Sequence, residues 1–173
     1  MRLVPSLPAT VFGLVLAAPA WFAPAQAQTA DWQTFSPPGG GFAVEMPCKS
    51  EIKSEEKNGH KRDTVLCAFD KAKAGADLVF MVKYERRSEA PGPEAQATLD
   101  NVVKAITEGG TLISNNKDDI GGYPARSFVM HDKDKDFYQW RIVVTDKYFV
   151  EVLFLGPKDN ELGQKYLESF EVN

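Results

Sequence analysis

Two cysteines are the residues whose type and spacing point most directly to a covalent bond. Cys48 and Cys67 are the only cysteines in 173 residues, and cysteines of exported proteins commonly pair. A disulfide is the interpretation we favour, with two free thiols as the alternative. A redox CxxC pair is missing, and two cysteines with His60 and His131 show no recognised zinc-site spacing. The predicted bond is structural rather than catalytic.

A run of alternating charges is the one local pattern that suggests a cation ligand. Asp132, Asp134 and Asp136 alternate with Lys133 and Lys135, and alternating carboxylates occur in calcium-binding loops. The run lacks the EF-hand glycine at the sixth position and the glutamate at the twelfth, and its two lysines would repel a cation. We predict a solvated hairpin loop without a metal, and the three aspartates stay weak candidates.

Motifs for catalysis and for phosphate binding are missing from the sequence. It contains no GxSxG, HExxH, GxxxxGK[ST] or strand-linked GxGxxG. His60 and His131 are expected to be exposed loop residues rather than general bases. The basic runs His60-Lys61-Arg62 and Arg86-Arg87 could dock an acidic partner, although such clusters are usually solvated. We therefore expect no catalytic residue, no cofactor and no enzyme activity.

The first 27 residues have the layout of a secretory signal peptide. Arg2 is their only charged side chain, an apolar stretch runs from Val11 to Ala18, and Ala25-Gln26-Ala27 ends the segment. An uncleaved anchor is the alternative, but the stretch falls short of the roughly 20 residues that span a bilayer. We predict cleavage after Ala27 and a soluble periplasmic or secreted protein.

The mature chain is acidic and has the length of one domain. Loss of Arg2 leaves 19 Lys and Arg against 24 Asp and Glu, a net charge of about −5, which argues against nucleic acid or an anionic membrane as partner. Residues 28–173 are long enough to bury one core. A second apolar stretch of membrane-spanning length is missing, so we expect no membrane insertion after cleavage.

Alternating strands and two helices must position these residues. Asn58-Gly59 is a strong hairpin signal that joins the polar segment 51–57, an expected edge strand, to 61–69. Apolar residues at helical spacing predict helices within 94–108 and 160–169. Further strands are expected at 31–35, 42–46, 77–85, 111–114, 125–130, 137–145 and 148–155.

The segments 137–145 and 148–155 are apolar enough to form the centre of a sheet with cover on both faces. We therefore predict an α+β fold, an α/β/α sandwich with a central antiparallel sheet and helices on both faces.

Five segments, taken in order, resemble PsbP-like proteins: WQTFSPPGGGFAVEMP, LDNVV, IGGYPARSF, YFVEVLF and YLESF. This family is related to the extrinsic oxygen-evolving protein of photosynthesis, to bacterial DcrB lipoproteins and to a yeast Ran-binding import factor. The resemblance covers most of the mature chain and implies an α/β/α sandwich with a docking or assembly role. It identifies no partner-binding residue, and this chain lacks the lipid-bearing cysteine of the lipoprotein branch.

The leading hypothesis is an exported, periplasmic, non-enzymatic accessory factor that acts by protein–protein binding or assembly on an envelope protein of unknown identity. The alternative is a small-ligand or metal-binding periplasmic module, and an unrecognised hydrolase ranks third. An exposed apolar patch would favour the first. A concave apolar pocket with converging polar groups would favour the second.

Overall fold

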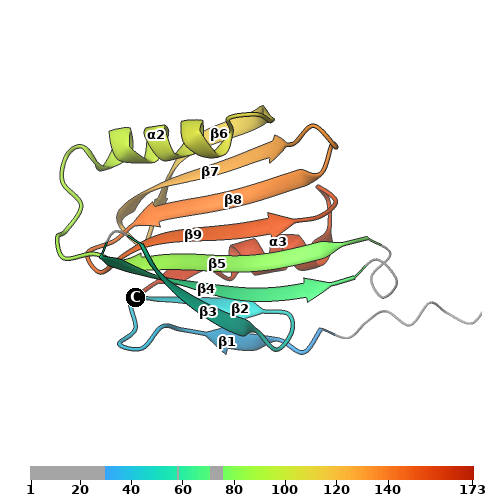
Figure 1. The fold of residues 1–173 in the computed structure, drawn as a ribbon, viewed down its shortest axis with the longest axis horizontal. Coiled ribbons are helices and arrows are strands. Elements are labelled where there is room, and N and C mark those ends of the chain that lie inside the picture. Colours follow the sequence, from blue (N-terminus) through green and yellow to red (C-terminus); the bar gives the residue numbers. More distant parts are fainter. Residues whose placement is uncertain (1–29, 58, 71–75) are drawn as a thin grey trace, which may run out of the picture.

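Strands dominate the structure, a computed structural model that describes residues 30–57, 59–70 and 76–173. Within these ranges ten strands form two antiparallel sheets, accompanied by two helices (Figure 1). The predicted signal peptide, residues 1–27, lies outside them. Among the described residues, no helix is long and apolar enough to cross a membrane. The strands are β1 (Gln33–Phe35), β2 (Phe42–Met46), β3 (Glu51–Lys57), β4 (His60–Phe69), β5 (Leu78–Arg86), β6 (Thr111–Ile120), β7 (Tyr123–His131), β8 (Phe137–Val144), β9 (Tyr148–Leu155) and β10 (Glu171–Val172), and the helices are α2 (Ala95–Ile106) and α3 (Glu161–Glu168).

The larger sheet has the order β3-β4-β5-β9-β8-β7-β6, and every neighbouring pair is antiparallel. β3 lies at one edge, as its polar sequence predicts, and Lys57 pairs with His60 across the hairpin. β9 has three strands on each side and β8 lies next to it. The prediction that the two most apolar segments form the centre of the sheet is confirmed.

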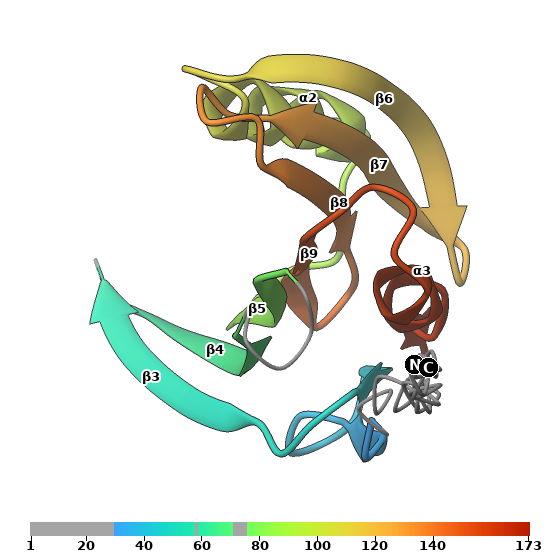
Figure 2. The same cartoon turned by 90° about the vertical axis from the view of Figure 1, so that its right-hand side faces the viewer.

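Aromatic side chains form the main core on one face of this sheet. Phe80 on β5 has its ring centroid 5.2 Å from that of Phe154 on β9 and 5.3 Å from that of Tyr166 on α3. The smaller sheet, β1-β2-β10, contributes Phe42, whose ring lies 5.4 Å from Tyr84. Figure 2 shows α3, β1 and β2 together on this side of the sheet. Each ring buried here stabilises the fold by about 1.5–3 kcal/mol.

α3 approaches the sheet closely because one of its residues has no side chain. A Cβ atom on Gly163 would overlap the ring of Phe154. Asn160 caps this helix, because its side-chain oxygen accepts from the Gly163 N–H at 3.0 Å. The buried hydroxyl of Tyr166 donates to the Met81 carbonyl at 2.7 Å, which satisfies its hydrogen bonding.

The opposite face of the large sheet is covered by α2, which contacts β7 and β8. Leu99 and Val103 lie one turn apart and both turn toward the sheet. Trp140 stacks on Phe128 with ring centroids 5.8 Å apart, so its indole packs against this core. The buried residues of the cluster are Leu99, Val103, Phe128, Ile142 and Val144.

The predicted α/β/α sandwich with helices on both faces is wrong. The described residues contain two short helices, of 12 and 8 residues, which are too few to form a layer on either face. The segments 31–35 and 42–46, expected in the central sheet, instead pair with each other and with the unpredicted β10. This second sheet buries apolar side chains such as Phe42 and Val44 against the first sheet, and so provides much of the cover that was assigned to helices.

Candidate functional site

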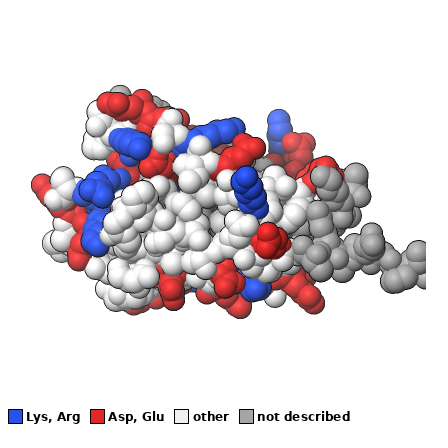
Figure 3. All heavy atoms as spheres, turned by 90° about the horizontal axis from the view of Figure 1, so that it is seen from below, with Lys and Arg blue, Asp and Glu red and all other residues white. Residues whose placement is uncertain are grey.

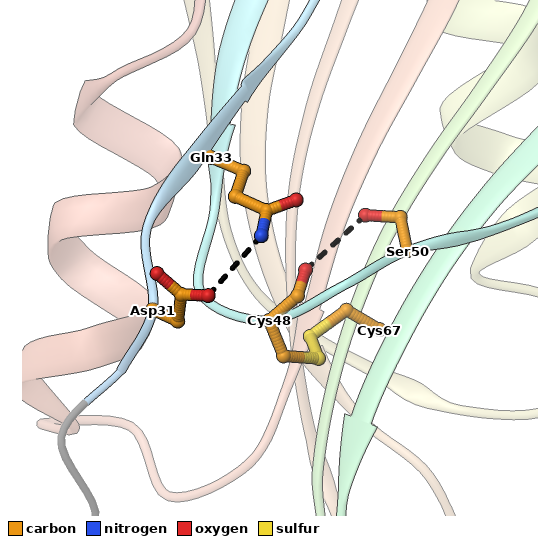
Figure 4. The surroundings of a disulfide bond; sticks show 5 residues. All are labelled: Asp31, Gln33, Cys48, Ser50 and Cys67. Carbon is orange, nitrogen blue, oxygen red and sulfur yellow. Dashed lines mark hydrogen bonds between the residues drawn. A yellow bond between two sulfur atoms is a disulfide. The ribbon is translucent and has the colours of Figure 1, made fainter.

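The disulfide predicted between Cys48 and Cys67 is present, with Cα atoms 5.9 Å apart. Cys48 follows β2 and Cys67 lies in β4, so the bond joins the two sheets (Figure 4). The Ser50 hydroxyl donates to the Cys48 carbonyl at 3.4 Å, and Gln33 donates to Asp31 nearby at 3.2 Å. Cys67 is buried in the main core. Cys48 packs against the same core, so the bond has a packing role.

The acidic loop between β7 and β8 folds around one of its own carboxylates. Oδ1 of Asp132 accepts from the backbone N–H groups of Asp134 and Asp136 at 2.9 and 3.1 Å. Its Oδ2 accepts from the Tyr138 hydroxyl at 3.0 Å. Burial alone would raise the pKa of Asp132, but these hydrogen bonds and nearby Lys133 lower it. Both oxygens of this carboxylate therefore already accept hydrogen bonds, one from the loop backbone and one from Tyr138 on β8.

The three aspartates do not join a larger cluster of potential metal ligands. Within the described residues, no group of three or more His, Cys, Asp or Glu side chains is placed to hold a metal ion. The alternating Asp and Lys residues 132–136 lie in a turn, in which Lys135 takes a left-handed backbone conformation with φ 66°. The prediction for calcium stays open to direct measurement.

Neither histidine has the partners of a general base. His60 Nδ1 lies 3.0 Å from a Glu85 oxygen at an exposed position on β4. His131 Nδ1 lies 3.0 Å from the Asp132 carbonyl. Among the described residues, no Ser or Cys side chain forms a hydrogen bond with either ring. The arrangement offers no nucleophile–base pair.

The two basic runs, far apart in sequence, meet in one groove. β4 and β5 pair so that Arg62 lies opposite Glu85, which brings the start of β4 beside the end of β5. The groove, about 620 Å³ in volume, is named here the basic groove. It is lined by Gly59, His60, Lys61, Glu85, Arg86, Arg87, Ser88 and Glu89.

The outer edge of β6 carries apolar side chains that sequence analysis missed. β6 is the last strand of the large sheet and pairs only with β7. Leu112 and Ile113 are 42% and 44% exposed, and Ile52 on β3 is the other large exposed apolar residue among the described residues. A register shift leaves Ile113 without a partner on β7. The uncharged run TLISNN, followed by the charged KDD, is the signal in sequence that marks this edge.

A partly buried carboxylate, Glu151, lies on the central strand of the large sheet. Glu151 on β9 is the cross-strand partner of Lys83 on β5. Burial raises the pKa of Glu151, while Lys83 and Arg62 oppose this rise and Glu85 adds to it.

Comparisons with known proteins leave the family open. No protein-family model matches the chain, and no curated protein matches it. A crystal structure from Bacteroides thetaiotaomicron VPI-5482, determined at 1.50 Å resolution, is similar with a TM-score of 0.38 and 13% sequence identity. The similarity covers 82% of this chain and 48% of that one, so this chain spans about half its length. The resemblance to PsbP-like proteins stays a prediction.

Proposed function

We propose that this chain is an exported, non-enzymatic accessory factor that binds an envelope protein along the edge strand β6. The observation that carries the proposal is the exposed pair Leu112 and Ile113 on an unpaired edge. An open edge offers backbone N–H and C=O groups to an extended segment of a partner. Apolar side chains next to such an edge supply burial area on binding.

The contrast between the two edges supports this choice. β3, with the sequence EIKSEEK, carries five charged residues among seven, which discourages pairing with other chains. The first six residues of β6, 111–116, carry no charge. The bulge at Ile113 is a feature that commonly re-aims a side chain at a sheet edge. A partner strand of about six residues would extend roughly 20 Å along this segment.

The experiment compares matched substitutions on the two edges. Leu112→Ser with Ile113→Ser should abolish recovery of the partner when the full exported protein is cross-linked in intact cells and purified. Ile52→Ser removes an even more exposed apolar side chain from β3 and should leave recovery unchanged. Equal recovery with both variants would refute a contact at β6. A saturable small ligand, or turnover of a substrate without any partner, would favour the alternative classes.

A further inference from the structure

The basic groove holds cations that the chain itself does not neutralise. Within the groove, Glu85 is paired twice, with Arg62 Nη2 at 3.1 Å and with His60 Nδ1 at 3.0 Å. Lys61 lies 3.6 Å from Asp63. Arg86 and Arg87 form no ion pair among the described residues. Glu85 and Asp63 are therefore bound to other cations, whereas Glu89, which also lines the groove, forms no ion pair with Arg86 or Arg87.

Neutral groups hold both arginines in place. The Arg86 guanidinium carbon lies 5.8 Å from the centroid of the Tyr148 ring, and its Nη2 lies 3.5 Å from the Tyr148 hydroxyl. Arg87 Nε donates to the Glu89 carbonyl at 3.3 Å. A guanidinium has five N–H donors, so each side chain keeps several donors for a ligand. Anchoring a flexible side chain beforehand lowers the entropy that binding would cost.

A third cation lies next to this pair. The Arg87 backbone N–H donates to the Lys147 carbonyl at 2.7 Å, which ties the end of β5 to the turn before β9. The Lys147 ammonium lies 3.5 Å from the Gly39 carbonyl and forms no ion pair among the residues described. Figure 3 shows Lys and Arg side chains gathered at the left end of the molecule, where β5 ends and β9 begins in Figure 1.

We propose that the basic groove binds a short acidic peptide segment whose carboxylates pair with Arg86 and Arg87. Guanidinium and carboxylate form paired, charge-assisted hydrogen bonds. The ligand must be short, because the whole chain has a net charge of −4 and Asp and Glu side chains surround the cationic end (Figure 3). A long polyanion or an anionic membrane would meet these carboxylates, whereas screening over about 8 Å lets a short segment avoid them.

This inference uses a different surface and a different chemistry from the contact at β6. The probe is a fluorescent peptide of eight residues in which glutamates alternate with serines, and its counterpart has glutamine at each glutamate. Fluorescence anisotropy of the full exported protein should show saturable binding of the acidic peptide that weakens with salt. The glutamine peptide should not bind. Failure of the acidic peptide to bind at low salt would overturn the proposal.

Variants that remove the same number of charges separate specific binding in the basic groove from non-specific electrostatic attraction. Arg86→Gln with Arg87→Gln should weaken peptide binding at least about tenfold, because two charge-assisted bonds are lost. Lys104→Gln with Lys158→Gln, which removes two exposed cations elsewhere, should change it less than about twofold. Equal losses in the two variants would refute the groove. Arg87→Gln alone keeps the Arg86 contact with Tyr148, and so tests the groove if the double variant fails to fold.

Two further measurements fix the class of ligand. Tighter binding to phosphatidylglycerol vesicles or to a DNA oligonucleotide than to the acidic peptide would contradict the peptide assignment. The variant carrying Leu112→Ser and Ile113→Ser should bind the peptide like the unmodified protein. This result allows the proposal for the basic groove to be rejected independently of the proposed contact at β6.

Discussion

The buried guanidinium of Arg126 on β7 is bonded to the half-exposed carboxylate of Asp100 on α2. Arg126 Nε and Nη2 both donate to Asp100 Oδ1, at 2.9 and 2.5 Å. Arg126 is 1% exposed, whereas the Asp100 side chain is 52% exposed. Gln96 on the same helix also accepts from Arg126. This polar contact fixes α2 on the sheet beside the apolar contacts of Leu99.

Replacing Asp100 by Ala should destabilise the fold by about 1–3 kcal/mol, because it leaves a buried cation with one charged partner fewer. Water reaches Asp100, which limits the loss of folding stability. Urea unfolding measures the change in stability, with Asn101→Ala as the exposed control on the same helix. When Arg126 is already replaced by Met, Asp100→Ala should change the free energy of unfolding little, because the ion pair is already absent. An equal cost in both backgrounds would show that Asp100 does not act through Arg126.

Reduction of the disulfide should lower the free energy of unfolding by roughly 3 kcal/mol, because the bond closes a loop between residues 19 positions apart. The melting temperature with and without reductant measures this change. A variant with Cys48→Ser and Cys67→Ser should start lower and should not respond to reductant. Two thiols titrated in the unreduced, purified protein would rule the bond out.

Gly163→Ala should destabilise the protein by about 1–3 kcal/mol, because the added methyl group meets the Phe154 ring. Helix propensity alone predicts the opposite sign, a gain of about 1 kcal/mol. Denaturant unfolding therefore decides between local propensity and packing. Gln164→Ala, at the exposed neighbouring position, is the control. Phe154→Leu should reduce the penalty of the added methyl group, and an unchanged penalty would count against this contact.

The acidic loop should depend on Asp132 and not on Asp134. Asp132→Ala removes the acceptor of three hydrogen bonds and should lower the melting temperature, whereas Asp134→Ala should leave it nearly unchanged. Because folding lowers the pKa of Asp132, its stabilisation is present above the unfolded pKa and is lost as pH falls through the folded pKa. Melting curves at several pH values measure this difference.

Calcium should not bind to the loop in the micromolar range. Lys133 and Lys135 balance much of the local negative charge, and both Asp132 oxygens already accept hydrogen bonds. Calorimetric titration of the purified protein should show no saturable signal. A micromolar calcium signal that Asp134→Ala abolishes would instead support the metal-binding alternative.

The free energy of unfolding of the protein, compared with that of a Glu151→Gln variant, should rise as the pH falls. Folding raises the pKa of this carboxyl through burial, so ionisation costs stability at every pH above the folded pKa. This cost disappears as pH falls from the folded pKa to the unfolded value of about 4.3. Urea unfolding of the protein and of Glu151→Gln across this window measures it. A difference that does not change with pH would contradict the assignment.

Local patterns in the sequence were sufficient to predict most elements. The hairpin signal at Asn58-Gly59, the helical spacing of Leu99 and Val103, and the apolar segments 137–145 and 148–155 depend on neighbours in the chain, so a single sequence discloses them. The pairing of Cys48 with Cys67 was the simplest choice because the chain contains no other cysteine. These features are predictable because few other turns, helices or cysteine pairings are compatible with the same residues.

The tertiary structure decided which strands share a sheet and which side chains meet. Nothing local tells β2 to leave the central sheet and pair with β10, because these two strands are more than a hundred residues apart in the sequence. The bond between Arg126 and Asp100 and the meeting of His60 with Arg86 in one groove join residues of different elements, 26 positions apart in each case, so no single segment discloses them. Contacts over such separations depend on the packing of the whole chain, which the residue pattern of any one segment does not encode.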